Sequence, residues 1–167
     1  MDAQEVDKLQ CLMKNMTNRP DITSLALTVM AKGHAFGASS FHVLRICSGI
    51  RSLHLSFHHD LEEQTACSSD CICDQPTNWK TEEFSLNHLQ ELEIKGFGAS
   101  EHEVAFVMRL LNWATVLKMM TVIFSHSTTE SKGKECFQMF QSFSRPGMCM
   151  KFYIYREFSK VPYAPED

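Results

Sequence analysis

Three cysteines in the middle of the chain are the residues whose chemistry is easiest to name. Cys67, Cys71 and Cys73 follow His58 and His59, and thiolate and imidazole groups are ligands that zinc prefers. Their spacing is C-x3-C-x-C, whereas zinc modules commonly carry two C-x2-C pairs, so one cysteine of a pair is missing. The sequence therefore predicts no metal site, and the three cysteines are only weak candidates for one.

A surface loop over residues 60–83 is the structural interpretation of the same segment. Asp74, Gln75 and Pro76 form a turn signal that ends the loop, and Trp79 can pack it back onto the body of the protein. We favour this interpretation and expect no cofactor. A small zinc or redox protein that uses the Cys67 to Cys73 loop is an alternative that metal analysis would exclude.

The histidines do not form a catalytic motif. Eight are scattered along the chain without H-E-x-x-H spacing, and the sequence has no Gly-rich phosphate loop and no nucleophile elbow. A Cys–His pair that meets only in the folded chain stays open, because sequence does not show proximity. We predict that the protein is not an enzyme.

Composition agrees with one modest domain. The chain has 167 residues, of which 44% are hydrophobic, so it can bury a core without disulfides or metal. A net charge of -4 without a basic run argues against nucleic acid as a partner. The chain has no apolar run long enough to cross a bilayer, and its first residues do not resemble a signal peptide, so we expect no membrane partner and a cytoplasmic or nuclear location. In such a compartment most of the seven cysteines are expected to be thiols.

The second half of the chain begins with a strand, a capped helix and another strand. Apolar and charged residues alternate over 91–94, which predicts a half-buried strand broken at Gly96 and Gly98. Ser100 and Glu103 have the spacing of a capping box, which predicts a helix start near Glu101. Apolar residues then recur at i, i+3, i+4 and i+7 and leave only a narrow polar strip, so we expect this helix to be covered on most sides.

An apolar triplet with the spacing φ-x-x-φ-x-φ recurs along the chain. The triplet starts are 28, 39, 28 and 32 residues apart, close to the period of about 20 to 29 residues in leucine-rich repeats, with an insertion in the second interval. Helical patterns lie between the triplets over residues 38–46 and 136–143. Repeated strand–helix units predict an α/β fold, a short curved leucine-rich-repeat solenoid with parallel strands and flanking helices. The triplets are Ile22/Leu25/Leu27, Ile50/Leu53/Leu55, Leu89/Leu92/Ile94, Leu117/Met120/Val122 and Cys149/Phe152/Ile154.

The sequence of residues 89–124 resembles the FBD domain of plants. This domain lies at the C-terminal end of F-box proteins that carry leucine-rich repeats in their central region. The preceding segment CDQPTNWKTEE also resembles the lead-in to that domain. In the family these are fold positions, so the resemblance implies an FBD-type βαβ unit and a binding role. The matching residues are Glu91, Glu93, Ile94, Gly96, Phe97, Glu101, His102, Glu103, Leu110, Leu111, Ala114, Leu117, Lys118, Met120 and Thr121.

The resemblance also implies a division of the chain. We expect the N-terminal helix of a partial repeat over 1–20, a leucine-rich-repeat region over 21–88, an FBD domain over 89–158 and a flexible tail over 159–167. An N-terminal repeat without a cap exposes apolar faces, so we expect self-association or a partner at residues 1–20.

The expected function is that of a non-enzymatic protein–protein interaction module. It resembles the substrate-recognition part of an F-box protein in an SCF-type ubiquitin ligase, with an unknown target protein. Nothing in the chain resembles the F-box that binds the Skp1 adaptor, so association with the Skp1–cullin ligase is expected only through a longer relative. A truncated paralogue that acts as a free-standing or competing binder is the alternative.

The concave side of the predicted solenoid is the expected binding surface. In each strand the residues that flank the inward apolar positions face this side, where solenoids commonly bind partners. Tyr153 and Tyr155 are the strongest candidates, because aromatic residues beside charged ones are enriched at interfaces. The predicted partner-binding residues are His54, Glu91, Glu93, Lys95, Met119, Thr121, Lys151, Tyr153 and Tyr155.

Overall fold

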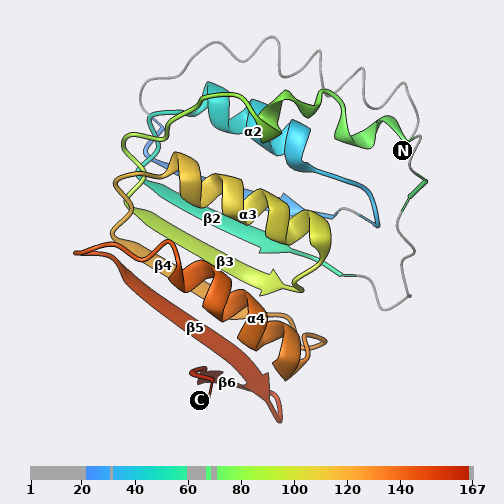
Figure 1. Ribbon diagram of the computed structural model, residues 1–167, viewed down its shortest axis with the longest axis vertical. Coiled ribbons are helices and arrows are strands. Elements are labelled where there is room, and N and C mark those ends of the chain that lie inside the picture. The colour runs from blue at the N-terminus through green and yellow to red at the C-terminus, as the bar shows by residue number, and fades with distance from the viewer. Residues whose placement is uncertain (1–21, 31, 60–66, 69–70, 166–167) are drawn as a thin grey trace.

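One six-stranded sheet organises the protein. The computed structural model describes residues 22–30, 32–59, 67–68 and 71–165 (Figure 1). The strands are β1 (Ser24–Val29), β2 (Ser52–Phe57), β3 (Glu91–Phe97), β4 (Met119–Phe124), β5 (Cys149–Arg156) and β6 (Ser159–Pro162). Within the described residues the α-helices are α2 (Gly37–Ile46), α3 (Glu101–Trp113) and α4 (Glu130–Gln141), and two short 3-10 helices are η1 (Ile72–Asp74) and η2 (Thr77–Lys80).

The order of the strands in the sheet is their order along the chain. Strands β1 to β5 are parallel, and each of the connections after β1, β3 and β4 contains an α-helix. Neighbouring parallel strands require such crossovers, because the chain must return to the end of the sheet where the previous strand began before the next strand can start. The mixed α/β class, the parallel strands and the flanking helices are confirmed.

The strand register confirms most of the repeat alignment read from the triplets. Leu53 pairs with Leu92 and Leu92 with Met120, so equivalent triplet positions lie side by side. In the fifth triplet the alignment is wrong by two residues, since Met120 pairs with Met150 and not with Phe152. Successive side chains alternate between the faces of a strand, so a shift of two leaves the assignment of faces unchanged.

The helices lie on one face of the sheet (Figure 1). Leu53, Leu55 and Ile94 point to that face and are fully buried in the core, together with Phe106 and Leu110 of α3. The alternate residues of β1 and β2 are exposed or partly exposed. Among the residues that the structure describes, the sheet therefore has one face packed against helices and one face without a helix, which we call the helix-free face.

The start of α3 is where the capping pattern predicts it. Ser100 is the N-cap, and its hydroxyl accepts a hydrogen bond from the Glu103 amide at 3.3 Å. Gly96 does not end β3, which continues to Phe97. Between Lys95 and Phe97 the register with β4 shifts by one residue, so Gly96 is the extra residue of a β-bulge with φ +68°.

Residues 71–80 pack against the body of the protein through Trp79. This side chain is 3% exposed, lies against the Phe106 ring and approaches Gly37 so closely that a Cβ there would be 2.3 Å from the indole. Asp74 accepts a hydrogen bond from the indole N–H at 3.1 Å. The predicted packing of the loop through Trp79 is confirmed for these residues.

The C-terminal residues differ from the expectation of a flexible tail over 159–167. Ser159–Pro162 forms β6, which pairs antiparallel with β5 through a tight reversal at Glu157 and Phe158. The segment lacks a strong alternating pattern, so its order comes from pairing with β5 and from Tyr163, which packs against Phe137 and Phe124. The predicted helix over 1–20 lies outside the described residues.

Candidate functional site

The predicted partner-binding residues lie together on the helix-free face. The parallel register of β1 to β5 aligns residues far apart in sequence into three rows across the strands. The first row is Ser24, Ser52, Glu91, Met119 and Cys149, the second Ala26, His54, Glu93, Thr121 and Lys151, and the third Thr28, Ser56, Lys95, Ile123 and Tyr153. All nine predicted residues belong to this face, with Tyr155 one step beyond the third row.

The centre of the face carries a connected set of charged and polar groups. Glu93 Oε1 lies 3.3 Å from His54 Nδ1 and 3.2 Å from Lys95 Nζ, and the Ser52 hydroxyl lies 3.2 Å from His54 Nε2. Partial burial raises the pKa of Glu93, but the hydrogen bonds from Lys95 and His54 outweigh burial and lower the pKa overall. The centre therefore presents a carboxylate flanked by donors, with Glu91 and Lys151 exposed beside it.

The tyrosines at the β5 end of the face are half-buried and supported by neighbours. Tyr155 stacks on the His126 ring with centroids 3.9 Å apart, and the Lys160 ammonium lies 5.0 Å from the Tyr153 ring centroid. Next to them Ile123 is 4% exposed although it does not belong to the main core. These contacts hold the two aromatic rings in fixed positions, which lowers the entropic cost of using them in recognition.

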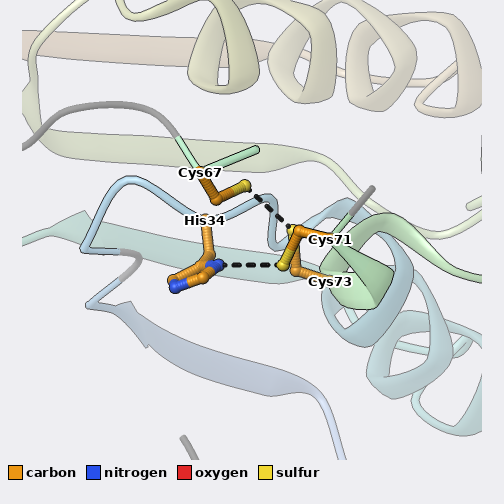
Figure 2. A group of neighbouring side chains, drawn as sticks. All are labelled: His34, Cys67, Cys71 and Cys73. Carbon is orange, nitrogen blue, oxygen red and sulfur yellow. Dashed lines mark hydrogen bonds between the residues drawn. The ribbon is translucent and has the colours of Figure 1, made fainter. Parts of the chain in front are cut away.

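A second group of side chains gathers where the connection after β1 meets η1 and the residues just before it. His34, Cys67, Cys71 and Cys73 converge (Figure 2), and one ligand atom from each lies within 4.8 Å of all the others. The sequence pointed to the three cysteines but not to His34, which is 33 residues before Cys67. His59 is not part of the group, because its Nε2 donates to the Gly96 carbonyl at 2.9 Å.

The thiols of this cysteine cluster influence one another. Hydrogen bonding to Cys73 raises the pKa of Cys67 to about 11. For Cys71, a backbone hydrogen bond at Cys73 and the Cys73 and His34 side chains lower the pKa to about 7. A thiol with a pKa near 7 is partly ionised at physiological pH. The thiolate is the form that binds metals and attacks electrophiles.

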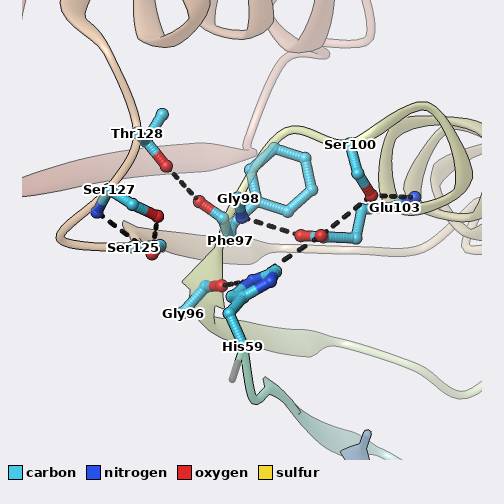
Figure 3. Close-up of polar contacts among 9 residues, drawn as sticks. All are labelled: His59, Gly96, Phe97, Gly98, Ser100, Glu103, Ser125, Ser127 and Thr128. Atoms are coloured by element: carbon cyan, nitrogen blue, oxygen red, sulfur yellow. Dashed lines mark hydrogen bonds and ion pairs between the residues drawn. The ribbon is translucent and has the colours of Figure 1, made fainter. Parts of the chain in front are cut away.

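A buried carboxylate links the bulge of β3 to the start of α3 (Figure 3). Glu103 is 4% exposed, accepts from the Gly98 amide at 2.7 Å and the Ser100 hydroxyl at 2.9 Å, and lies 3.6 Å from His59. Burial outweighs these interactions and raises the pKa of Glu103. Nearby, Thr128 donates to the Phe97 carbonyl at 2.9 Å. These bonds fix the loops at the ends of β3 and β4.

No helix in the described part of the chain is long and apolar enough to cross a membrane. Comparison with curated proteins and with solved structures gives no match. Residues 84–122, which include β3, α3 and the first residues of β4, match the model of the FBD family. This match supports the FBD part of the resemblance, and it covers residues 84–122 only.

Proposed function

We propose that the protein is a non-enzymatic protein–protein interaction module whose partner docks on the helix-free face of the sheet. The observation that supports this most directly is the alignment of Glu91, Glu93, Lys95 and Lys151 by the register of three adjacent strands. A rigid sheet that presents both charge signs beside aromatic rings provides contact area and electrostatic complementarity for a protein surface.

The family match supports a finer proposal about the biological role. FBD domains are associated with F-box proteins, so the chain is proposed to recognise substrates as part of an SCF-type ubiquitin ligase of plants. The parallel strands in chain order, with helices on one face, are the arrangement expected of a short leucine-rich-repeat solenoid. In this proposal the ubiquitin-transfer chemistry belongs to the partners, and the chain acts in the cytoplasm or nucleus.

Affinity purification from plant cells tests the ligase part of this proposal. The tagged chain and a full-length F-box relative would be purified in parallel, and bound proteins identified by mass spectrometry. Recovery of a shared target with both baits is the expected result, and Skp1 and cullin on the shorter bait would place it in a ligase through a longer relative. Baits with no shared target would contradict the role in substrate recognition.

Charge reversal on the two faces tests the docking surface itself. Glu91→Lys alters the helix-free face, and Glu135→Lys makes the same charge change on an exposed position of α4. We expect the first variant to weaken target binding about tenfold or more, because like charges in an interface repel, and the second to bind normally. Equal binding by both variants would remove the helix-free face as the docking surface.

The two tyrosines provide a second test with its own folding control. Replacing Tyr153 and Tyr155 by serine removes both rings and their contacts to Lys160 and His126. We expect target binding to fall while the far-ultraviolet circular dichroism spectrum stays unchanged, because neither ring belongs to the main core. Unchanged binding would exclude the tyrosines from the contact surface.

A further inference from the structure

The cysteine cluster has the composition of a complete four-ligand metal site. Three thiols and one imidazole supply four donor atoms, the number that zinc takes in structural sites. The sequence argued against zinc because the spacing is C-x3-C-x-C and one cysteine of a C-x2-C pair is missing. The fold supplies that ligand, since the connection after β1 brings His34 next to Cys67, Cys71 and Cys73 (Figure 2).

The distances between donor atoms agree with the edges of a tetrahedron around one ion. Zn–S bonds of about 2.3 Å and tetrahedral angles require sulfur atoms roughly 3.8 Å apart, and Zn–N bonds are only slightly shorter. Cys67 Sγ and Cys73 Sγ are 3.5 Å apart, and Cys71 Sγ lies 3.4 Å from His34 Nδ1. All pairs are within 4.8 Å, so small side-chain rotations are sufficient to place four donors around one centre.

Backbone hydrogen bonds hold the ligands from two separate segments. The Ala35 amide donates to Cys73 Sγ at 3.3 Å, an interaction that stabilises a thiolate in the manner of the outer-shell bonds around metal ligands. The Cys67 amide donates to the Gly33 carbonyl at 3.1 Å, which attaches the first cysteine to the segment that carries His34. On the other side, Trp79 anchors the chain that follows Cys73.

A disulfide accounts for the arrangement less well. Any single S–S bond uses two sulfur atoms and leaves the third thiol and the imidazole without a role, although all four groups converge. The Cys67 and Cys73 sulfur atoms are 3.5 Å apart, well beyond the bond length of about 2.05 Å. Among divalent ions, soft thiolates with imidazole favour zinc over the oxygen-preferring magnesium and calcium.

We propose that His34, Cys67, Cys71 and Cys73 bind one Zn²⁺ ion in a closed structural site. Each thiol that still carries its proton releases it to solvent as the zinc–sulfur bond forms. With four protein ligands no coordination position is left for substrate, so the role of the ion is to join η1 and the residues just before it to the connection after β1. The site is separate from the helix-free face and does not depend on the proposed partner-binding function.

Metal content of the full chain tests the proposal directly. The protein would be expressed with zinc in the medium, purified under reducing conditions without a metal-affinity resin and analysed by mass spectrometry for metals. One zinc per chain is expected. In parallel, Co²⁺ added to metal-free protein is expected to give the visible bands of tetrahedral cobalt and a sulfur-to-cobalt charge-transfer band. Absence of stoichiometric zinc together with absence of these bands would overturn the proposal.

Variants distinguish this site from adventitious binding to surface thiols. Cys71→Ser and His34→Ala are expected to weaken zinc binding more than about 100-fold, since loss of an outer-shell partner alone typically costs 10- to 100-fold. His34→Cys keeps four ligands and is expected to restore tight binding with a stronger charge-transfer band. Cys149→Ser is the matched control, because that cysteine is exposed and lies outside the cluster.

Two results would contradict the ligand assignment even if some metal is found. Equal zinc affinity of the wild type and His34→Ala would remove the imidazole from the site. A disulfide between Cys67 and Cys73 in protein isolated under reducing conditions, detected by peptide mass mapping, would show that the cluster is a redox pair instead.

Discussion

Gly96, the bulge residue of β3, is where a single methyl group should damage the sheet most. Its φ of +68° belongs to the left-handed region, and a Cβ built there would lie 2.3 Å from the carbonyl oxygen of Phe57 in β2. A backbone carbonyl cannot rotate away as a side chain can, so the two strands must separate. Gly147 is the matched control, because its φ is +83° but a Cβ there meets nothing within 4 Å.

Comparing the two positions gives the expected loss of unfolding free energy at Gly96. A left-handed conformation costs alanine roughly 1–2 kcal/mol, and this cost applies to both substitutions. Overpacking adds about 1–3 kcal/mol at Gly96 alone, for a total of about 2–5 kcal/mol against a typical domain stability of 5–15 kcal/mol. The gain from a less flexible unfolded chain is the same for both variants, so it cancels in the difference.

Urea unfolding monitored by circular dichroism measures both variants against the wild type. We expect Gly96→Ala to lower the unfolding free energy by at least about 1 kcal/mol more than Gly147→Ala, with unchanged m-values. Equal losses for the two variants would show that the close approach of Gly96 to Phe57 does not exist in solution and would refute the bulge.

Two further predictions concern the elements that hold the loops in place. Gly37→Ala is expected to lower stability by about 1–3 kcal/mol through its clash with the Trp79 indole, whereas Gly49→Ala, with open space around it, is not. Gly37→Ala in a Trp79→Phe background should lower the urea midpoint less, relative to Trp79→Phe alone, than it does in the wild type. An equal decrease of the midpoint in both backgrounds would exclude the clash. The raised pKa of Glu103 means that the folded protein holds this proton more tightly than the unfolded chain, so stability should fall as pH rises from the ordinary glutamate pKa through the raised one. Glu103→Gln should lose this fall in the unfolding free energy with rising pH, because glutamine does not titrate. His59 is present in both proteins and serves as an internal control. Identical pH profiles of the unfolding free energy in the wild type and the variant would refute the raised pKa of Glu103.

Features encoded by local spacing could be predicted from the sequence. The start of α3 follows from Ser100 and Glu103, because the Ser100 hydroxyl accepts from the Glu103 amide and the Glu103 carboxylate accepts from the Gly98 amide just before the helix. The face on which each β-strand residue lies follows from period-two alternation, which is why even the misaligned fifth triplet assigned Tyr153 and Tyr155 to the correct side.

Features that depend on contacts between distant segments could not be predicted. The bulge at Gly96 follows from the pairing of β3 with β4, and the order of β6 follows from pairing with β5. In the candidate metal site, the cysteines were visible as a cluster, but His34 joins them only because Gly33 and Cys67 bond across 34 residues of chain. Sequence spacing contains no signal for such a ligand.

The central claim is that the helix-free face of the sheet recognises a protein partner. Once affinity purification has identified a target, hydrogen–deuterium exchange of the free and bound chain tests this claim most directly. We predict protection in Glu91–Phe97, Met119–Phe124 and Cys149–Arg156, with no change in α4 (Glu130–Gln141) on the opposite side. Protection confined to the helices, with the strands unchanged, would contradict the account.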